Sequence, residues 1–80
     1  MRSMDEPSLV IDCTGMRCPM PVIELTRRLE DVEVDQVIGL LADDPAARAD
    51  VPAWCRLRGQ KYLGARQRGA RRLFLVRRTS

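Results

Sequence analysis

The stretch Gln36–Pro45 reads QVIGLLADDP. Its first seven residues, Gln36–Ala42, are nearly all apolar and have the length of one strand. Such a run is typical of a central strand that is covered on at least one face. The acidic pair that follows, with Pro45 directly behind it, is a typical helix start, because Asp caps free N–H groups and proline fits the first turn. The stretch therefore predicts a strand that leads through a short loop into a helix.

The residues before this stretch predict one more strand and one more helix. Ser8–Asp12 has an apolar centre and the length of a short strand. From Pro19 to about Asp31 the pattern is helical, with charged residues opposite a face that holds Val22, Leu25, Thr26 and Leu29. We expect residues 1–7 to form a flexible N-terminal tail and residues 8–80 to form a single domain.

The helix that follows Pro45 is expected to contain a break. The helical pattern runs to Leu57, and Gly59 ends it. Pro52 lies inside this segment, and a proline in a helix interior removes a hydrogen bond and clashes with the preceding turn. We therefore expect an interruption near Val51, with a second helical start there.

The end of the chain predicts a β-hairpin. Lys61–Ala65 and Arg72–Arg78 have the composition of two strands, and a turn around Arg68-Gly69 joins them. The element order is then β-α-β-α-β-β. Helices of about ten residues that cross between strands predict a two-layer α/β sandwich.

The composition excludes several classes of protein. The chain is 45% hydrophobic, which is too much for a disordered protein. No apolar run approaches the ~20 residues that span a bilayer, and the start lacks the pattern of a signal peptide. We therefore expect a cytoplasmic protein that does not engage a membrane. Three cysteines and no histidine argue against a disulfide scaffold, a zinc site and any catalytic pair that needs histidine.

Charge is divided unevenly along the 80 residues. Residues 1–53 contain all 11 acidic residues and five arginines, a net charge of −6, whereas residues 54–80 contain eight arginines, one lysine and no acid, a net charge of +9. Only Trp54, Tyr62 and Phe74 are available there for base stacking, which does not favour direct binding of nucleic acid. We expect a basic face that docks an acidic protein partner. Its residues are Arg56, Arg58, Arg66, Arg68, Arg71 and Arg72.

The motif with the clearest chemistry is Cys18-Pro19-Met20-Pro21. Two prolines so close together fit only the first turn of a helix, at positions N1 and N3, so they fix where the helix begins. Cys18 then lies at or just before the N-cap, where the helix dipole, free N–H groups and the adjacent Arg17 are expected to lower the pKa of its thiol. The alternative is a passive N-cap, but cysteine is a poor cap. We therefore interpret Cys18 as a reactive cysteine.

The neighbours of Cys18 have possible supporting roles. Gly15 is expected to supply conformational freedom to the loop, and Asp12 to bond loop backbone groups, although an ordinary turn would use the same residues. Cys13 could resolve an oxidised or persulfidated Cys18 as a disulfide, but we favour a buried strand-end residue. Cys55 is interpreted as a core residue.

The motif and its surroundings resemble a known family. Ile11–Val22 follows the pattern Ile-Asp-x-x-Gly-x-x-Cys-Pro-x-Pro-Val, which looks like the signature of the TusA/SirA-type sulfur carriers. Ala42–Ala46 (ADDPA), with Asp50–Cys55 (DVPAWC) behind it, is similar to the second helix region of that family. The resemblance covers residues 8–78. The chain departs from the family pattern at Cys13, where the family has threonine, and in its dense C-terminal arginines.

The resemblance implies a fold and a role. The fold is a four-stranded mixed sheet with two helices on one face, similar to the C-terminal domain of translation initiation factor 3. The role is that of a sulfurtransferase-type carrier, in which Cys18 accepts sulfane sulfur as a persulfide and passes it on. The family's donors are cysteine desulfurases or rhodanese-like proteins, and its acceptors serve tRNA 2-thiouridine, molybdenum-cofactor and sulfur-oxidation pathways. Pyridoxal phosphate would belong to the donor, and this chain would need no cofactor.

Two other functions remain open at this point. A basic adaptor for RNA or for an acidic protein would leave Cys18 incidental. A redox thiol protein would use Cys13 and Cys18 as a pair.

Overall fold

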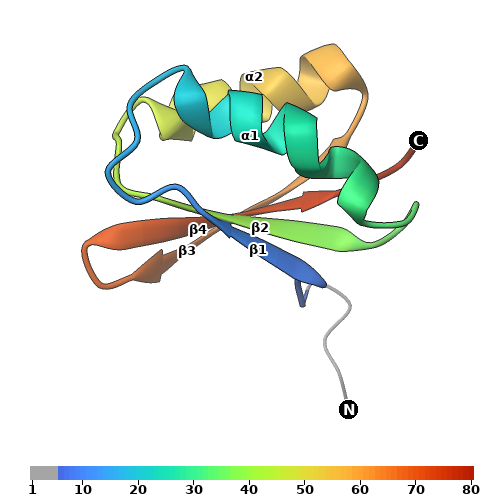
Figure 1. Ribbon diagram of the computed structural model, residues 1–80, viewed down its shortest axis with the longest axis horizontal. Helices are drawn as coiled ribbons and strands as arrows, with labels where there is room; N and C mark the ends of the chain where they lie inside the picture. The colour runs from blue at the N-terminus through green and yellow to red at the C-terminus, as the bar shows by residue number, and fades with distance from the viewer. Residues whose placement is uncertain (1–5) are drawn as a thin grey trace.

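The computed structural model describes residues 6–80. Residues 1–5 of the predicted N-terminal tail lie outside the described residues. A sheet of four strands carries two helices on one face (Figure 1). The elements in chain order are β1 (Leu9–Asp12), α1 (Met20–Arg28), the 3₁₀ turn η1 (Leu29–Asp31), β2 (Val37–Ala42), α2 (Ala47–Arg58), β3 (Lys61–Arg68) and β4 (Arg71–Arg77).

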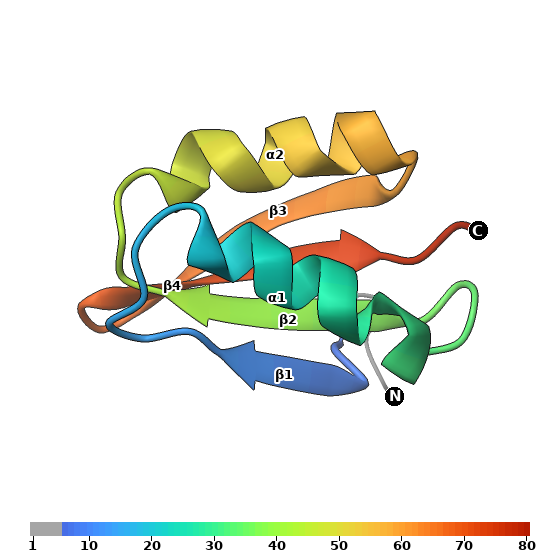
Figure 2. The same ribbon diagram turned by 45° about the horizontal axis from the view of Figure 1, so that its top comes forward.

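The sheet is mixed, with the strand order β1-β2-β4-β3. β1 pairs with β2 in parallel, whereas β4 pairs antiparallel with both β2 and β3. β2 therefore lies inside the sheet, as its apolar sequence predicts. Both helices cover the same side (Figure 2). The two-layer fold expected from the sequence, with a mixed sheet and helices on one face, is confirmed.

The main core lies between the sheet and the helices. Alternate strand residues face the helices, and Ile38, Leu40 and Val76 are fully buried there against Leu25 and Val51. A smaller cluster of Val37, Leu73 and Leu75 lies apart from this core, on the opposite face of the sheet.

Gly39 has a packing role in the centre of β2. A Cβ atom at this position would lie 2.9 Å from Cδ1 of Leu73 and 3.3 Å from Cβ of Pro7. Glycine in a strand often marks such a close approach of neighbouring chain segments. Pro7 therefore packs against the sheet through the space that Gly39 leaves.

The predicted break in α2 is wrong, because the helix runs continuously from Ala47 to Arg58 with Pro52 inside it. A proline in a helix interior costs about 3 kcal/mol. Val51 and Trp54 are buried against the core, and burial of each such side chain contributes about 1.5–3 kcal/mol. Packing of this face therefore offsets the lost hydrogen bond. Within residues 6–80, no helix has the length and apolar character needed to cross a membrane.

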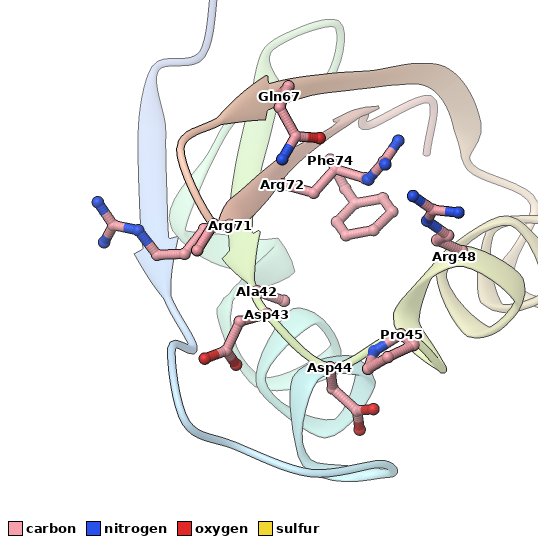
Figure 3. A pocket seen from close by; sticks show the side chains of 10 residues that line it. Ala42, Asp43, Asp44, Pro45, Arg48, Gln67, Arg71, Arg72 and Phe74 are labelled. Carbon is pink, nitrogen blue, oxygen red and sulfur yellow. The ribbon is translucent and has the colours of Figure 1, made fainter.

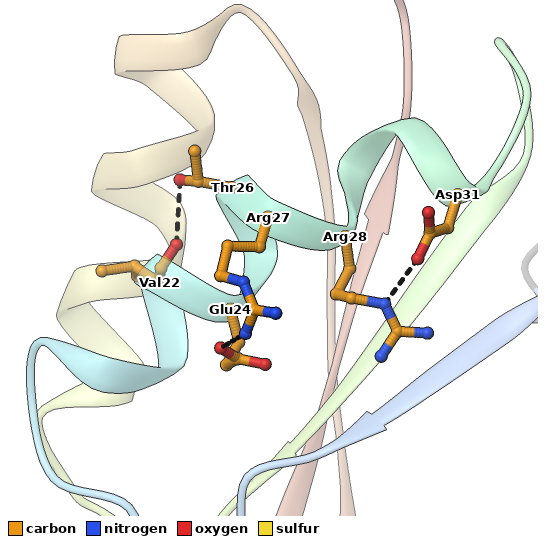
Figure 4. Close-up of polar contacts among 6 residues, drawn as sticks. All are labelled: Val22, Glu24, Thr26, Arg27, Arg28 and Asp31. Carbon is orange, nitrogen blue, oxygen red and sulfur yellow. Dashed lines mark hydrogen bonds and ion pairs between the residues drawn. The ribbon is translucent and has the colours of Figure 1, made fainter.

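A polar chain links the two helices. The indole N–H of Trp54 donates a 2.9 Å hydrogen bond to Oγ1 of Thr26. The Thr26 hydroxyl in turn donates to the carbonyl oxygen of Val22 over 3.0 Å (Figure 4). Two ion pairs on the first helical segment lie at the surface (Figure 4), where such pairs contribute about 0–1 kcal/mol. They are Glu24–Arg27 and Arg28–Asp31.

Candidate functional site: the Cys18 loop

The candidate site lies at the edge of the sheet where β1 and β2 both end. Because these two strands run in parallel, the segments that follow them meet at the same edge. The loop after β1 carries Cys18, and the loop after β2 carries Asp43 and Asp44. The carboxyl ends of parallel strands are a common position for functional sites in α/β proteins.

Two carboxylates after β2 hold the backbone of the cysteine loop. The N–H of Cys18 donates a 2.7 Å hydrogen bond to Oδ2 of Asp44, and the N–H of Gly15 donates a 2.9 Å bond to Oδ1 of Asp43. The other oxygen of Asp44, Oδ1, accepts from the N–H of Ala46 over 3.1 Å. Hydrogen bonds to a charged acceptor are stronger than neutral ones, so these contacts fix the loop relative to β2.

Contacts within the loop follow the roles predicted for Asp12 and Gly15. Oδ1 of Asp12 accepts hydrogen bonds from the backbone N–H of Thr14 over 3.0 Å and from its hydroxyl over 2.6 Å. These bonds lower the pKa of the Asp12 carboxyl. Gly15 has φ +83°, a left-handed conformation that side chains disfavour. Both residues therefore shape the turn that leads to Cys18.

The two prolines set the start of α1, one position later than predicted. Pro19 is the N-cap and follows a cis peptide bond, Met20 is the first helical residue, and Pro21 is the second. Cys18 lies one residue before the N-cap, and it is exposed. The helix predicted to begin at Pro45 likewise begins later, at Ala47, after a turn.

The predicted lowering of the Cys18 pKa is wrong for this arrangement of charges. A hydrogen bond to the Asp50 carboxylate raises the pKa of the Cys18 thiol, and so do desolvation and the negative charges of Asp50 and Asp44. The charge of Arg17 acts on a different group. The pKa of Asp44 is lowered mainly by hydrogen bonds from the N–H groups of Cys18 and Ala46, and the charge of Arg17 lowers it further by a smaller amount. The resting site is therefore a protonated, exposed thiol among carboxylates.

Comparison with known proteins adds to this geometry. The family described as Sulfurtransferase TusA matches residues 9–78. The chain belongs to the TusA family. It is 31% identical over 67 residues to sulfur carrier protein TusA of Pseudomonas entomophila, an alignment that covers 84% of each chain. A sulfur carrier protein of Archaeoglobus fulgidus is 43% identical over 53 residues, or 66% of this chain and 69% of its own.

A longer relative shares the same unit. The sulfur carrier protein YrkF of Bacillus subtilis is 33% identical over 66 residues, which cover 82% of this chain but only 36% of that protein. The chain thus spans about a third of YrkF and most of the other two relatives. Membership of the TusA family gives this chain a sulfur carrier role, which implies contact with sulfur donor and acceptor proteins.

The other two cysteines of this TusA family member are buried. Cys13 has no exposed surface, and burial raises the pKa of its thiol to about 11, with smaller contributions from Glu24 and Asp12. Cys55 is 2% exposed, and burial likewise raises its pKa to about 11. The interpretation of both as core residues is confirmed. A buried Cys13 does not reach the surface where Cys18 is presented.

The six arginines predicted to form one basic face are divided by the fold. Arg66 is paired with Leu73 and Arg68 with Arg71, and Arg66 and Arg68 lie on the sheet face without helices. The guanidinium of Arg71 reaches the cysteine loop at the end of the sheet, where it donates to Oγ1 of Thr14 over 3.5 Å. Arg72 is paired with Gln67 on the helix side. The remaining two, Arg56 and Arg58, lie in the last turn of α2. The six arginines therefore do not share one face, because side chains alternate between the two faces along β3 and β4. Docking of an acidic partner by these residues stays a prediction.

Two cavities lie beside the Asp43–Pro45 segment. The smaller, of about 210 Å³, is lined by Gly15, Arg17 and the Asp43–Pro45 segment. The larger, of about 330 Å³, lies on the hairpin side of the same segment. Within residues 6–80, no group of three or more His, Cys, Asp and Glu side chains is placed to hold a metal ion.

Sequence reasoning missed the carboxylates that surround the cysteine. Asp43 and Asp44 were interpreted as a helix start and as part of the family pattern, and Asp50 only as part of the family pattern. A signal was present for the first two. Since two parallel strands end at one edge, acidic residues directly after β2 are expected near the loop that follows β1. Asp50 depends on the packing of α2, which no local pattern predicts.

Proposed function

We propose that Cys18 carries sulfane sulfur as a persulfide, accepted from a donor such as a cysteine desulfurase or a rhodanese-like protein and passed to an acceptor. One observation carries this assignment: Cys18 is the exposed thiol, whereas Cys13 and Cys55 are buried. The loop that presents Cys18 is held by two carboxylates, which accept hydrogen bonds from the backbone N–H groups of Gly15 and Cys18. A fixed, accessible thiol is what repeated exchange with other proteins needs.

The chemistry is two thiol-exchange steps. The Cys18 thiolate attacks the outer sulfur of the donor's persulfide, a new S–S bond forms on Cys18, the donor's S–S bond breaks, and the donor cysteine leaves as a thiolate. The acceptor's thiolate then attacks the outer sulfur on Cys18 and regenerates the Cys18 thiolate. Neither step has net oxidation or needs a bound cofactor, and neither requires histidine.

The carboxylates around the thiol give the carrier a resting state. Only the thiolate attacks sulfur, and Asp50 and Asp44 favour the thiol. Deprotonation therefore follows the arrival of a partner that brings a cation to Asp50 or draws the carboxylate away from the thiol. A resting thiol is also less readily oxidised than a thiolate.

The surface beside Cys18 suits protein partners. Met20 and Ile23, both in the first turns of α1, are 43% and 42% exposed. Exposed apolar side chains next to a reactive group are typical of a contact surface. We place the relay in the cytoplasm, where thiols stay reduced, with acceptors in tRNA 2-thiouridine, molybdenum-cofactor or sulfur-oxidation pathways.

Intact-mass spectrometry tests the assignment. The protein is incubated with a cysteine desulfurase and cysteine, and a gain of about 32 Da, one sulfur atom, is expected. Cys18→Ser should abolish this gain, whereas Cys13→Ser, the matched control, should retain it.

The same assay separates the two alternative functions. An oxidised form about 2 Da lighter, lost equally in Cys13→Ser and Cys18→Ser, would indicate a redox pair. No adduct, together with salt-sensitive retardation of RNA, would indicate an adaptor. The burial of Cys13 speaks against the redox pair.

A further inference from the structure

The larger cavity, of about 330 Å³, lies on the far side of the Asp43–Pro45 segment from the cysteine loop. It lies between the start of α2 and the end of the β3–β4 hairpin (Figure 3). Phe74 and Ala70 contribute apolar surface, and Gln67 contributes an amide. Its volume is within the range of small ligand sites.

Three arginines line this cavity: Arg71, which donates to Oγ1 of Thr14, and Arg48 and Arg72. Arg48 comes from α2 and Arg72 from β4, and their guanidinium groups point toward each other beside the Phe74 ring (Figure 3). Within residues 6–80, neither guanidinium has a hydrogen bond or an ion pair. Two like charges that share a cavity repel each other, and an anion between them would remove that repulsion.

The carboxylates at the cavity wall do not neutralise these cations. Asp43 and Asp44 accept hydrogen bonds from the cysteine loop and from Ala46. In Figure 3 their carboxylate groups point away from Arg48 and Arg72. Among the residues that the structure describes, 6–80, no carboxylate therefore forms an ion pair with the guanidinium group of Arg48 or Arg72.

We propose that this cavity receives a carboxylate side chain of the sulfur donor or acceptor protein while that protein's cysteine meets Cys18. The inference rests on the proposed function. Guanidinium groups bind carboxylates through paired, charge-assisted hydrogen bonds. The Gln67 amide donates one N–H to the carbonyl oxygen of Gly69 over 2.6 Å and keeps its second N–H as a further donor. Because Asp44 lines the cavity and also bonds the Cys18 backbone, a partner that binds at the cavity is placed next to the thiol.

A protein carboxylate fits the cavity better than a nucleic acid does. Single-stranded nucleic acid is bound by aromatic side chains on which bases stack, and Phe74, the aromatic residue of this cavity, is only 2% exposed. The apolar surface of Ala70 and Pro45 suits the methylene groups of a Glu side chain.

NMR titration of the ¹⁵N-labelled full chain tests this site. The probe is a capped Gly-Glu-Gly-Glu-Gly peptide at constant ionic strength, and the matched control is its Gln counterpart. We expect saturable shifts at Ala70 and Arg72 with the Glu peptide only. Arg48→Gln and Arg72→Gln should each weaken binding about tenfold, whereas Arg56→Gln, which removes the same charge outside the cavity, should change it less than twofold.

Other outcomes would overturn the proposal. If Arg56→Gln weakened binding of the Glu peptide equally, or if the shifts did not saturate, the peptide would be responding to the general positive charge of the surface and not to this cavity. Saturation by inorganic phosphate or a short oligonucleotide without any response to the Glu peptide would assign the cavity to a different ligand. Because the titration does not involve the thiol, Cys18→Ser should bind the peptide normally. Failure of the docking site and failure of the persulfide assignment are therefore distinguishable.

Discussion

The backbone N–H of Cys18 donates a 2.7 Å hydrogen bond to the carboxylate of Asp44, a residue 26 positions further along the chain. This bond joins the loop after β1 to the segment after β2. The conformation that presents the thiol therefore depends on the parallel pairing of the first two strands.

Removal of this carboxylate should loosen the loop without unfolding the protein. In Asp44→Ala the N–H groups of Cys18 and Ala46 lose their acceptor. We expect hydrogen exchange at the Cys18 amide to become about tenfold faster. Asp31→Ala, which removes an exposed acid from η1, is the matched control. Unchanged exchange at Cys18 in Asp44→Ala would contradict this role of Asp44.

Asp50 should control the acidity of Cys18. Its carboxylate raises the pKa of the thiol, so Asp50→Asn should lower that pKa. The rate of alkylation by iodoacetamide follows the thiolate fraction, and its midpoint should therefore move to lower pH. Asp35→Asn removes an acid that has no part in the Cys18 shift and should leave the midpoint in place. A midpoint that stays fixed or rises in Asp50→Asn would refute the prediction.

The three thiols should differ sharply in reactivity. Burial raises the pKa of both Cys13 and Cys55 to about 11, so at neutral pH they are protonated as well as inaccessible. An aromatic disulfide reagent should detect one thiol rapidly in the native protein and all three in denaturant. Rapid reaction of a second native thiol would show that the fold opens around it.

The Asp12 and Asp44 carboxyls should make the fold sensitive to acid. Both have a folded pKa below the ordinary value of 3.8. Their stabilising contribution is therefore complete above that value and is lost as the pH falls toward the folded pKa. The urea midpoint should drop between about pH 5 and about pH 3. The drop should be smaller in Asp44→Asn, and an equal drop in this variant would argue against the linkage.

The contact between the helices should be measurable as stability. In Thr26→Val the indole N–H of Trp54 loses its acceptor, and Trp54 is only 7% exposed. An unsatisfied buried donor costs about 1–3 kcal/mol, so the free energy of unfolding should fall by about that amount in urea titration. Thr26→Ser keeps the hydroxyl and should lose clearly less.

The sequence predicted most of the fold because its signals are local. The apolar run Val37–Ala42, the prolines around Met20 and the helix end at Gly59 each determine an element through their own neighbours. Continuous α2 was not predictable from Pro52 alone, since its stability comes from burial of Val51 and Trp54 against residues distant in sequence.

Only part of the candidate site could be predicted from the sequence in this way. Cys18 and Gly15 are recognisable from local sequence, because a loop that leads into a helix with prolines in its first turn can adopt few backbone conformations. The carboxylates reach Cys18 from other elements and reverse the expected direction of its pKa shift. The charge of Arg17, adjacent in sequence, acts instead on Asp44. The pKa of a side chain depends on which charges lie near it in space, and for Cys18 these are not the charges that neighbour it in the sequence.

Localisation of the carried sulfur tests the central claim most directly. Protein loaded by a desulfurase is separated from it, alkylated with iodoacetamide, digested and sequenced by mass spectrometry. We predict the alkylated persulfide on Cys18 alone, with Cys13 and Cys55 unmodified, and its loss when an acceptor thiol is added before alkylation. A persulfide on Cys13 or Cys55, or one on Cys18 that no thiol removes, would contradict a carrier role for Cys18.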